Sequence, residues 1–299
     1  MAAENAAQLF SRLGSKQSLD GLDKKLFVDI PDGIKAGDVV EFYGKEGCGK
    51  TEMLLHLAAN CIMPRSWHEL YLGGKGVSVI FIDTDYHFQI LRLIAIMEYR
   101  VKTAFERHEE RHKEQTNEKD VKMKDIGKTA ESETLIKQCL TRLFIVRCNS
   151  SVELLATLLS MEQLIICKPE ICVMMIDSLS AFYWVDRSSG GESLQDQQEN
   201  IRKTTSVLSR FSRENHLVIF TTVHAIFGNN TKEMMRNQDY LCKAWQQSVK
   251  YRYMFTKQTE YDGKASQFCS VYVVQRTSPK TESKSNRFLI EEHGVVFIS

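Results

Sequence analysis

The sequence GKEGCGKT at positions 44–51 constrains this chain more than any other feature. It fits the pattern G-x-x-x-x-G-K-[ST], follows an apolar run over 38–43 and precedes a helical pattern over 51–62. A strand, a glycine-rich loop and a helix in this order form an anion site, because the glycines turn backbone N–H groups inward and the helix N-terminus adds positive potential. The chain is therefore predicted to bind nucleotide phosphates.

The residue types in this loop have distinct expected roles. Lys50 reaches the β- and γ-phosphates and Thr51 ligates Mg²⁺, so ATP with Mg²⁺ is the expected ligand. Cys48 is expected to be a small spacer, with a reactive thiol as the alternative. The predicted phosphate-binding residues are Gly44, Lys45, Glu46, Gly47, Cys48, Gly49, Lys50 and Thr51.

Apolar runs at 38–43, 77–82, 171–176 and 217–222 alternate with helical patterns. Continuous apolar runs are typical of strands buried on both faces of a parallel sheet. The alternation predicts an α/β fold, with a mostly parallel sheet flanked by helices. From residue 249 onward, alternating apolar and polar residues predict antiparallel strands that extend one edge of the sheet.

The sequence predicts a short N-terminal segment followed by one large domain that contains an insertion. Residues 1–37 are expected to be a short lead-in or linker, and 38–299 the ATPase domain. Between 98 and 128, nine Lys or Arg residues stand beside eight Asp or Glu residues, with almost no large apolar side chains. We therefore expect a charged insertion at about 100–134, either helical or disordered.

Composition excludes several function classes. The 39 basic and 38 acidic residues lack the basic excess of a free-standing DNA binder. No apolar run is long enough to cross a bilayer, so no membrane partner is expected. The eight cysteines show no zinc-type spacing and predict reduced thiols rather than a metal site.

Three carboxylates, Asp83, Asp85 and Asp177, follow predicted strands. An acid at a strand end is the usual second magnesium-side group of P-loop enzymes. If Asp83 has that role, its strand neighbours the loop strand, as in small-molecule kinases. If Asp177 has it, one strand lies between, and an acid on that strand could orient the attacking water. Sequence order favours Asp177, although each acid alone is also compatible with an ordinary strand-end turn.

Together GKEGCGKT, FIDTD at 81–85 and MMIDSLSAFYW at 174–184 resemble the RecA-like recombinase paralogue family. The resemblance runs from about residue 38 to the C-terminus, interrupted by the 100–134 segment. It implies a RecA-like core and a role in homologous-recombination repair in the nucleus. It also implies assembly with other recombinase paralogues, and help in loading the main recombinase on single-stranded or branched DNA that is shared with those partners.

The resemblance also implies residue roles. Lys50 and Thr51 fall on the phosphate and magnesium positions, and Asp177 on the magnesium-side acid. Asp85 falls where active recombinases carry a catalytic glutamate that orients the attacking water. Because a carboxylate displaced by roughly 1 Å can cost about a hundredfold in rate, the shorter Asp85 implies slow hydrolysis.

Residues 180–191 correspond to the family's first DNA-binding loop, in which Arg187 is the cation. Trp184 lies near a position where active recombinases use arginine, and it could stack on a base, be buried or contact a protein. His224 lies near the glutamine that senses the γ-phosphate in active recombinases, and an ordinary loop histidine is the alternative.

The leading hypothesis is an ATP-binding subunit of a recombination mediator complex. A free-standing DNA-dependent ATPase is the first alternative, which the short Asp85 disfavours. A small-molecule kinase with Asp83 on magnesium is the second, which the lack of an Arg-rich lid segment disfavours. The cations Lys243, Lys250, Arg252 and Lys257 could line a DNA face, but their alternation with aromatic residues equally predicts an ordinary half-buried strand.

Overall fold

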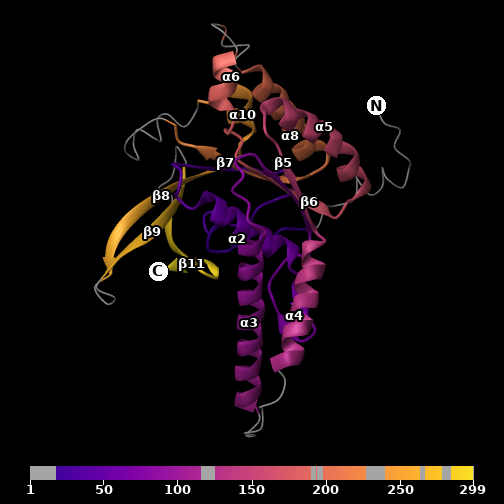
Figure 1. The fold of residues 1–299 in the computed structure, drawn as a ribbon, viewed down its shortest axis with the longest axis vertical. Helices are drawn as coiled ribbons and strands as arrows, with labels where there is room; N and C mark the ends of the chain where they lie inside the picture. Colours follow the sequence, from indigo (N-terminus) through magenta and orange to yellow (C-terminus); the bar gives the residue numbers. More distant parts are fainter. Residues whose placement is uncertain are drawn as a thin grey trace.

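The computed structural model describes residues 18–115, 125–189, 193, 198–226, 240–262, 267–277 and 284–298. One nine-stranded sheet, in the order β11-β10-β9-β8-β1-β7-β6-β4-β5, organises the chain (Figure 1). The strands are β1 (Val39–Gly44), β4 (Ser78–Asp83), β5 (Leu143–Arg147), β6 (Ile171–Asp177), β7 (Val218–His224), β8 (Tyr251–Asp262), β9 (Gln267–Arg276), β10 (Ser285–Glu291) and β11 (Gly294–Ile298). A small hairpin, β2 (Ser66–Trp67) and β3 (Leu70–Tyr71), stands apart from this sheet.

The pairing confirms the predicted fold class. Strands β5, β4, β6, β7, β1 and β8 run parallel, and β9, β10 and β11 continue one edge antiparallel. Because β1 is hydrogen-bonded to β7 and β8, the phosphate-loop strand is separated from β6 by one strand and from β4 by two. This order decides which strand-end acids can reach the loop.

Helices cover both faces of the sheet. One apolar core lies between the sheet and the helices α2 (Lys50–Ile62), α3 (Ile90–Gln115) and α4 (Asp125–Leu140). A second core lies beneath α5 (Ser151–Cys167), α8 (Glu199–Glu214) and α10 (Lys243–Ser248). Neighbouring residues of one strand alternate between these cores, as the two-residue period of a strand requires. No described helix is long and apolar enough to span a membrane.

The segment expected as a lead-in contributes to the first core. Its described part, 18–37, buries six apolar side chains there: Leu19, Leu22, Leu26, Phe27, Ile30 and Ile34. A polar cluster also holds it, since Asp23 Oδ2 lies 2.7 Å from His56 Nε2 of α2. Residues 18–37 therefore pack into the same core as the sheet, and the boundary predicted at residue 38 does not separate two cores.

The segment at 100–134 is helical in its described parts. Figure 1 shows α3 and α4 side by side as they extend away from the sheet. Val101 and Ala104 of α3, and Leu135 and Ile136 of α4, are buried. The charged segment therefore begins within a helix that packs on the core.

Candidate nucleotide site

The phosphate loop leaves β1 at Gly44 and enters α2 at Lys50. Gly47 and Gly49 have backbone φ angles of 70° and 89°, which residues with a Cβ atom rarely adopt. A Cβ on Gly44 would lie 2.4 Å from the Phe255 carbonyl oxygen. Glycine at these positions is therefore required by backbone geometry, which explains the motif spacing.

Lys50 is buried beneath the loop. Its Nζ donates to the carbonyl oxygens of Gly44 at 2.8 Å and Lys45 at 2.7 Å. Cys48 Sγ lies 3.7 Å from the same ammonium, and burial raises the pKa of the Cys48 thiol. A buried thiol with a raised pKa is a poor nucleophile, so the structure favours the spacer role for Cys48.

Thr51 and Asp177 meet at the base of the loop. Thr51 Oγ1 donates to Asp177 Oδ2 at 2.7 Å, and Thr222 Oγ1 donates to Asp177 Oδ1. Burial is the strongest influence on Asp177 and raises its pKa, against the lowering effect of these hydrogen bonds. A hydroxyl and a carboxylate in contact are the hard oxygen ligands that Mg²⁺ accepts beside phosphate oxygens. The pair therefore fits the expected ion.

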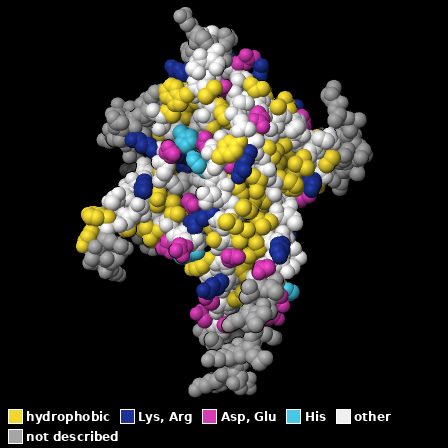
Figure 2. All heavy atoms as spheres, in the orientation of Figure 1, with side chains coloured by type: hydrophobic (Ala, Val, Ile, Leu, Met, Phe, Trp, Pro, Cys, Tyr) yellow, Lys and Arg dark blue, Asp and Glu magenta, His cyan; other side chains and the backbone are white. Residues whose placement is uncertain are grey.

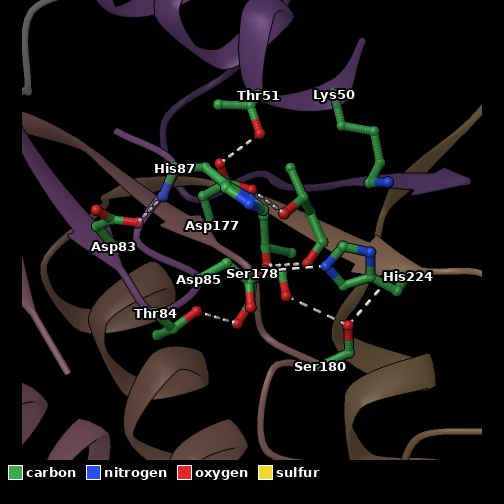
Figure 3. A network of polar contacts seen from close by, with 12 residues as sticks. Lys50, Thr51, Asp83, Thr84, Asp85, His87, Asp177, Ser178, Ser180 and His224 are labelled. Carbon is green, nitrogen blue, oxygen red and sulfur yellow. Dashed lines mark hydrogen bonds and ion pairs between the residues drawn. The ribbon is translucent and has the colours of Figure 1, made fainter. Parts of the chain in front are cut away.

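Three strand ends are joined around this point (Figure 3). The backbone N–H of Thr84, after β4, donates to the Asp177 carbonyl at 2.8 Å. Asp85 Oδ2 lies 2.9 Å from Nε2 of His224, at the end of β7, and the His224 N–H donates to Ser180 Oγ at 2.9 Å. The pairing of Asp85 with His224 could not be predicted from the sequence, because Asp85 follows β4 and His224 ends β7, and β6 lies between these two strands.

The pairing affects the Asp85 carboxylate. Burial acts to raise its pKa, but hydrogen bonds from His224 and Ser178 and the nearby histidine charge hold the pKa below its ordinary value. Asp85 is thus a charged acceptor already engaged by His224.

A pocket of about 410 Å³ lies over the loop. Among its lining residues are Lys50, Thr51, Asp177 and His224, whereas Asp85 is absent from the lining. The pocket has the size of a small-molecule site. Sequence reasoning missed four further lining residues, Glu52, His87, Tyr272 and Ile290, of which the last two come from the C-terminal strands. Only the sheet order brings those strands to the loop.

Asp83 is directed elsewhere. Its fully buried carboxylate accepts from the backbone N–H groups of His87 at 3.1 Å and Phe88 at 3.3 Å, and Arg147 Nε lies 3.5 Å away. Figure 3 shows it on the side of the cluster away from Lys50. The neighbouring-strand arrangement expected of a kinase-type Asp83 is absent, because two strands separate β4 from β1. The intervening strand β7 ends in His224 and carries no acid.

The first DNA-loop candidates lie on the short helix α6 (Tyr183–Ser189). Trp184 is 53% exposed, which argues against burial in this chain. Arg187 Nη1 donates to the Tyr183 hydroxyl at 2.6 Å, and its guanidinium lies 6.0 Å from the centre of a Trp184 ring. Residues 190–192, 194–197 and 227–239, which include the remainder of this loop, lie outside the described residues.

Two cations considered for a DNA face have acidic partners, one directly before β1 and one within it. Lys250 Nζ lies 2.6 Å from Asp38 Oδ1, and Arg252 is paired with the buried Glu41. Lys257 lies 5.7 Å from the Tyr272 ring centre, and Lys243 begins α10. Lys250 and Arg252 thus support the half-buried strand interpretation.

Comparison with known proteins agrees with this geometry. The Rad51 family model matches residues 20–109 and 117–296. Mouse DNA repair protein XRCC2 is 37% identical over 308 residues, covering 99% of this chain and 97% of its own length. The DNA repair protein XRCC2 homolog of Arabidopsis thaliana is 27% identical, covering 97% of this chain and 87% of its own. Human DNA repair protein RAD51 homolog 2 is 30% identical over 100 residues, 33% of this chain and 24% of its own. These matches confirm the predicted resemblance, and the chain belongs to the Rad51 family.

Proposed function

We propose that this chain is an ATP-binding recombinase paralogue in homologous-recombination repair of DNA breaks. It acts in the nucleus as one subunit of a mediator complex that assists recombinase loading on single-stranded DNA. The observation that carries the nucleotide assignment is the contact of Thr51 with Asp177 beneath the loop that surrounds Lys50. The names of the XRCC2 and RAD51 relatives support the repair role.

In this proposal the chain's own groups bind and orient ATP. The loop N–H groups and Lys50 hold the phosphates, and Lys50 exchanges its carbonyl contacts for phosphate oxygens. Thr51 and Asp177 hold Mg²⁺, which neutralises phosphate charge when bound. His224 lines the pocket and engages Asp85, which does not line it, so Asp85 orients water poorly and hydrolysis is slow. In this proposal ATP serves mainly to order the neighbouring loops, and DNA stimulates its hydrolysis.

Assembly with another paralogue requires an exposed face, and the β5 edge of the sheet provides one. Strand β5 is the last strand at this end of the described sheet and presents Ile145, 39% exposed, on the face of the first core. Val152 and Leu159 of α5, which are 63% and 50% exposed, lie on the other face. Figure 2 shows hydrophobic side chains gathered over α5 and the β5–β6 end of the sheet. Exposed apolar side chains at a terminal strand of the described sheet are a common basis for protein association.

Co-purification of the full chain with each candidate paralogue tests this assembly. Ile145→Asp should abolish recovery of the partner, whereas Tyr261→Asp at the far end of β8, 59% exposed, should not. Equal recovery with both variants would exclude the β5 edge as the interface.

ATP turnover, measured with and without single-stranded DNA, tests the main alternative. Rapid turnover by the chain alone would favour a free-standing DNA-dependent ATPase. The position of Asp83 argues against the small-molecule kinase.

A further inference from the structure

A second groove, of about 530 Å³, lies on the α3 side of the sheet. Its walls come from residues 21–25, the C-terminal half of α2, the middle of α3, the β3 strand and β11. It shares no lining residue with the pocket over the phosphate loop. Any ligand of this groove is therefore independent of the nucleotide site.

The groove carries an excess of positive charge. Lys24, Lys25 and Arg107 line it and are exposed. The acid in its lining is Asp23, whose carboxylate accepts hydrogen bonds from the backbone N–H groups of Lys25 and Leu26 and lies 2.7 Å from His56 Nε2. Asp23 is thus directed into the protein, while the three exposed cations face solvent.

The charges on α3 are segregated between its two sides. Arg107 and the half-buried Arg100 line this groove, whereas Glu98, Glu106 and Glu109 line a neighbouring hollow together with Lys102. The two hollows share Tyr99 and His293. Arg100 is held in place, because its guanidinium donates to the His56 carbonyl at 3.2 Å and to Asn60 Oδ1. A helix with mixed charge therefore presents a basic side to the groove.

Aromatic rings lie among these cations. Tyr71 is 64% exposed and Tyr99 is 42% exposed, and both line the groove. Tyr99 is stacked on His293 with ring centres 3.8 Å apart, and Lys25 Nζ lies 6.0 Å from the Phe297 ring centre. One face of the Tyr99 ring is therefore covered by His293, while Tyr71 is the more exposed ring. Cations and exposed rings in one groove are the combination that binds single-stranded nucleic acid, because phosphates contact the cations and unpaired bases stack on the rings.

One polar atom in the lining has no protein partner within the described part of the chain. Thr103 lines the groove, and its buried Oγ1 makes no hydrogen bond to the described residues. Buried hydroxyls are nearly always paired, so this one is an exception in the wall of the groove, but it is too buried to contact a ligand directly.

We propose that this groove binds single-stranded nucleic acid, with phosphates on Lys24, Lys25 and Arg107 and a base stacked on Tyr71 or Tyr99. The proposal goes beyond the function above, since this groove is separate from the DNA-loop candidates on α6, and it requires no ATP. A duplex is disfavoured, because its bases are stacked on one another and cannot lie on the rings.

The charge test uses the full chain without nucleotide and a fluorescein-labelled dT20 oligonucleotide, with anisotropy measured over a range of salt. For a single strand, the slope of log K against log salt falls by about 0.7 for each phosphate contact removed. Lys24→Ala with Lys25→Ala should reduce the slope by about 1.4, and Arg107→Ala by about 0.7. Lys102→Ala, an exposed cation on the other side of α3, is the matched control and should change nothing.

The ring test separates nucleic acid from other polyanions. Tyr71→Ala should weaken dT20 binding about fivefold or more, whereas binding of polyphosphate, which has no rings, should be unchanged. Tyr71→Phe should retain binding. Circular dichroism checks the fold of each variant, and Arg187→Ala reports separately on the α6 surface.

Three results would overturn the proposal. The first is failure of the wild-type chain to bind dT20. The second is an unchanged salt slope in the Lys24 and Lys25 double variant. The third is unchanged dT20 binding in both Tyr71→Ala and Tyr99→Ala, with polyphosphate competing as well as dT20, which would make the groove a general anion site.

Discussion

Replacing Glu41 with glutamine should destabilise this chain more than its small change in volume suggests. Glu41 lies in the middle of β1, and only 1% of its side chain is exposed. Its carboxylate accepts from Trp245 Nε1 at 2.6 Å and is paired with Arg252 of β8. These contacts fix α10 and β8 against the strand that leads into the phosphate loop.

The magnitude follows from what glutamine leaves behind. The amide oxygen of a glutamine can still accept from Trp245, but the guanidinium of Arg252, with its side chain 13% exposed, loses its negative partner. Removing one member of a buried ion pair typically costs 3–5 kcal/mol, because the remaining charge stays desolvated. Since Arg252 keeps a little solvent contact, we expect a loss of about 3 kcal/mol in the free energy of unfolding.

Urea denaturation followed by tryptophan fluorescence and circular dichroism measures this loss. Asp38→Asn is the comparison, because its partner Lys250 has 49% of its side chain exposed and should cost about 1 kcal/mol or less. Glu41→Gln combined with Arg252→Leu should recover part of the stability, since the half-buried cation that has lost the Glu41 charge is removed. A loss below about 1 kcal/mol for Glu41→Gln alone would refute the reasoning.

Two further predictions concern the site and the buried polar cluster. Asp85→Glu should accelerate single-turnover ATP hydrolysis by about tenfold or more, because one more methylene restores the reach of the glutamate that active recombinases carry. Equal hydrolysis by Asp85→Ala and the wild-type chain would remove Asp85 from the mechanism. Burial lowers the pKa of His56 below 6.5, so the unfolded chain takes up a proton at His56 before the folded chain does. The free energy of unfolding should therefore fall below pH 6.5, by up to about 1.4 kcal/mol per pH unit. Urea unfolding between pH 7.5 and 5.5 measures this change. The same dependence of stability on pH in His56→Gln as in the wild-type chain would contradict the prediction.

The fold was largely predictable from local pattern. The apolar runs and the glycine spacing depend on backbone geometry and on burial of both sheet faces, and those signals are local. The strand order is not local, because it depends on which helices cover each face. It was this order that excluded Asp83 and placed His224 beside Asp85.

Residues 18–37 show a different limit. Their apolar side chains, such as Leu26 and Phe27, form no long helix or strand, so periodicity gave no sign of their burial. Glu41 did carry a signal, because a carboxylate within an apolar strand requires a buried partner. That partner, Arg252, lies far away in the sequence and became identifiable only when β8 was placed beside β1.

Equilibrium titration of ATP with Mg²⁺ into the wild-type chain, Lys50→Ala and Lys45→Ala tests the central claim most directly. Lys50 places its buried ammonium beneath the loop, whereas the Lys45 side chain is exposed on the same loop and is the matched control. We predict that Lys50→Ala weakens binding at least tenfold, about 1.4 kcal/mol, and that Lys45→Ala binds nearly as well as wild type. Equal affinity of the wild-type chain and Lys50→Ala would contradict the assignment of this loop as the nucleotide site.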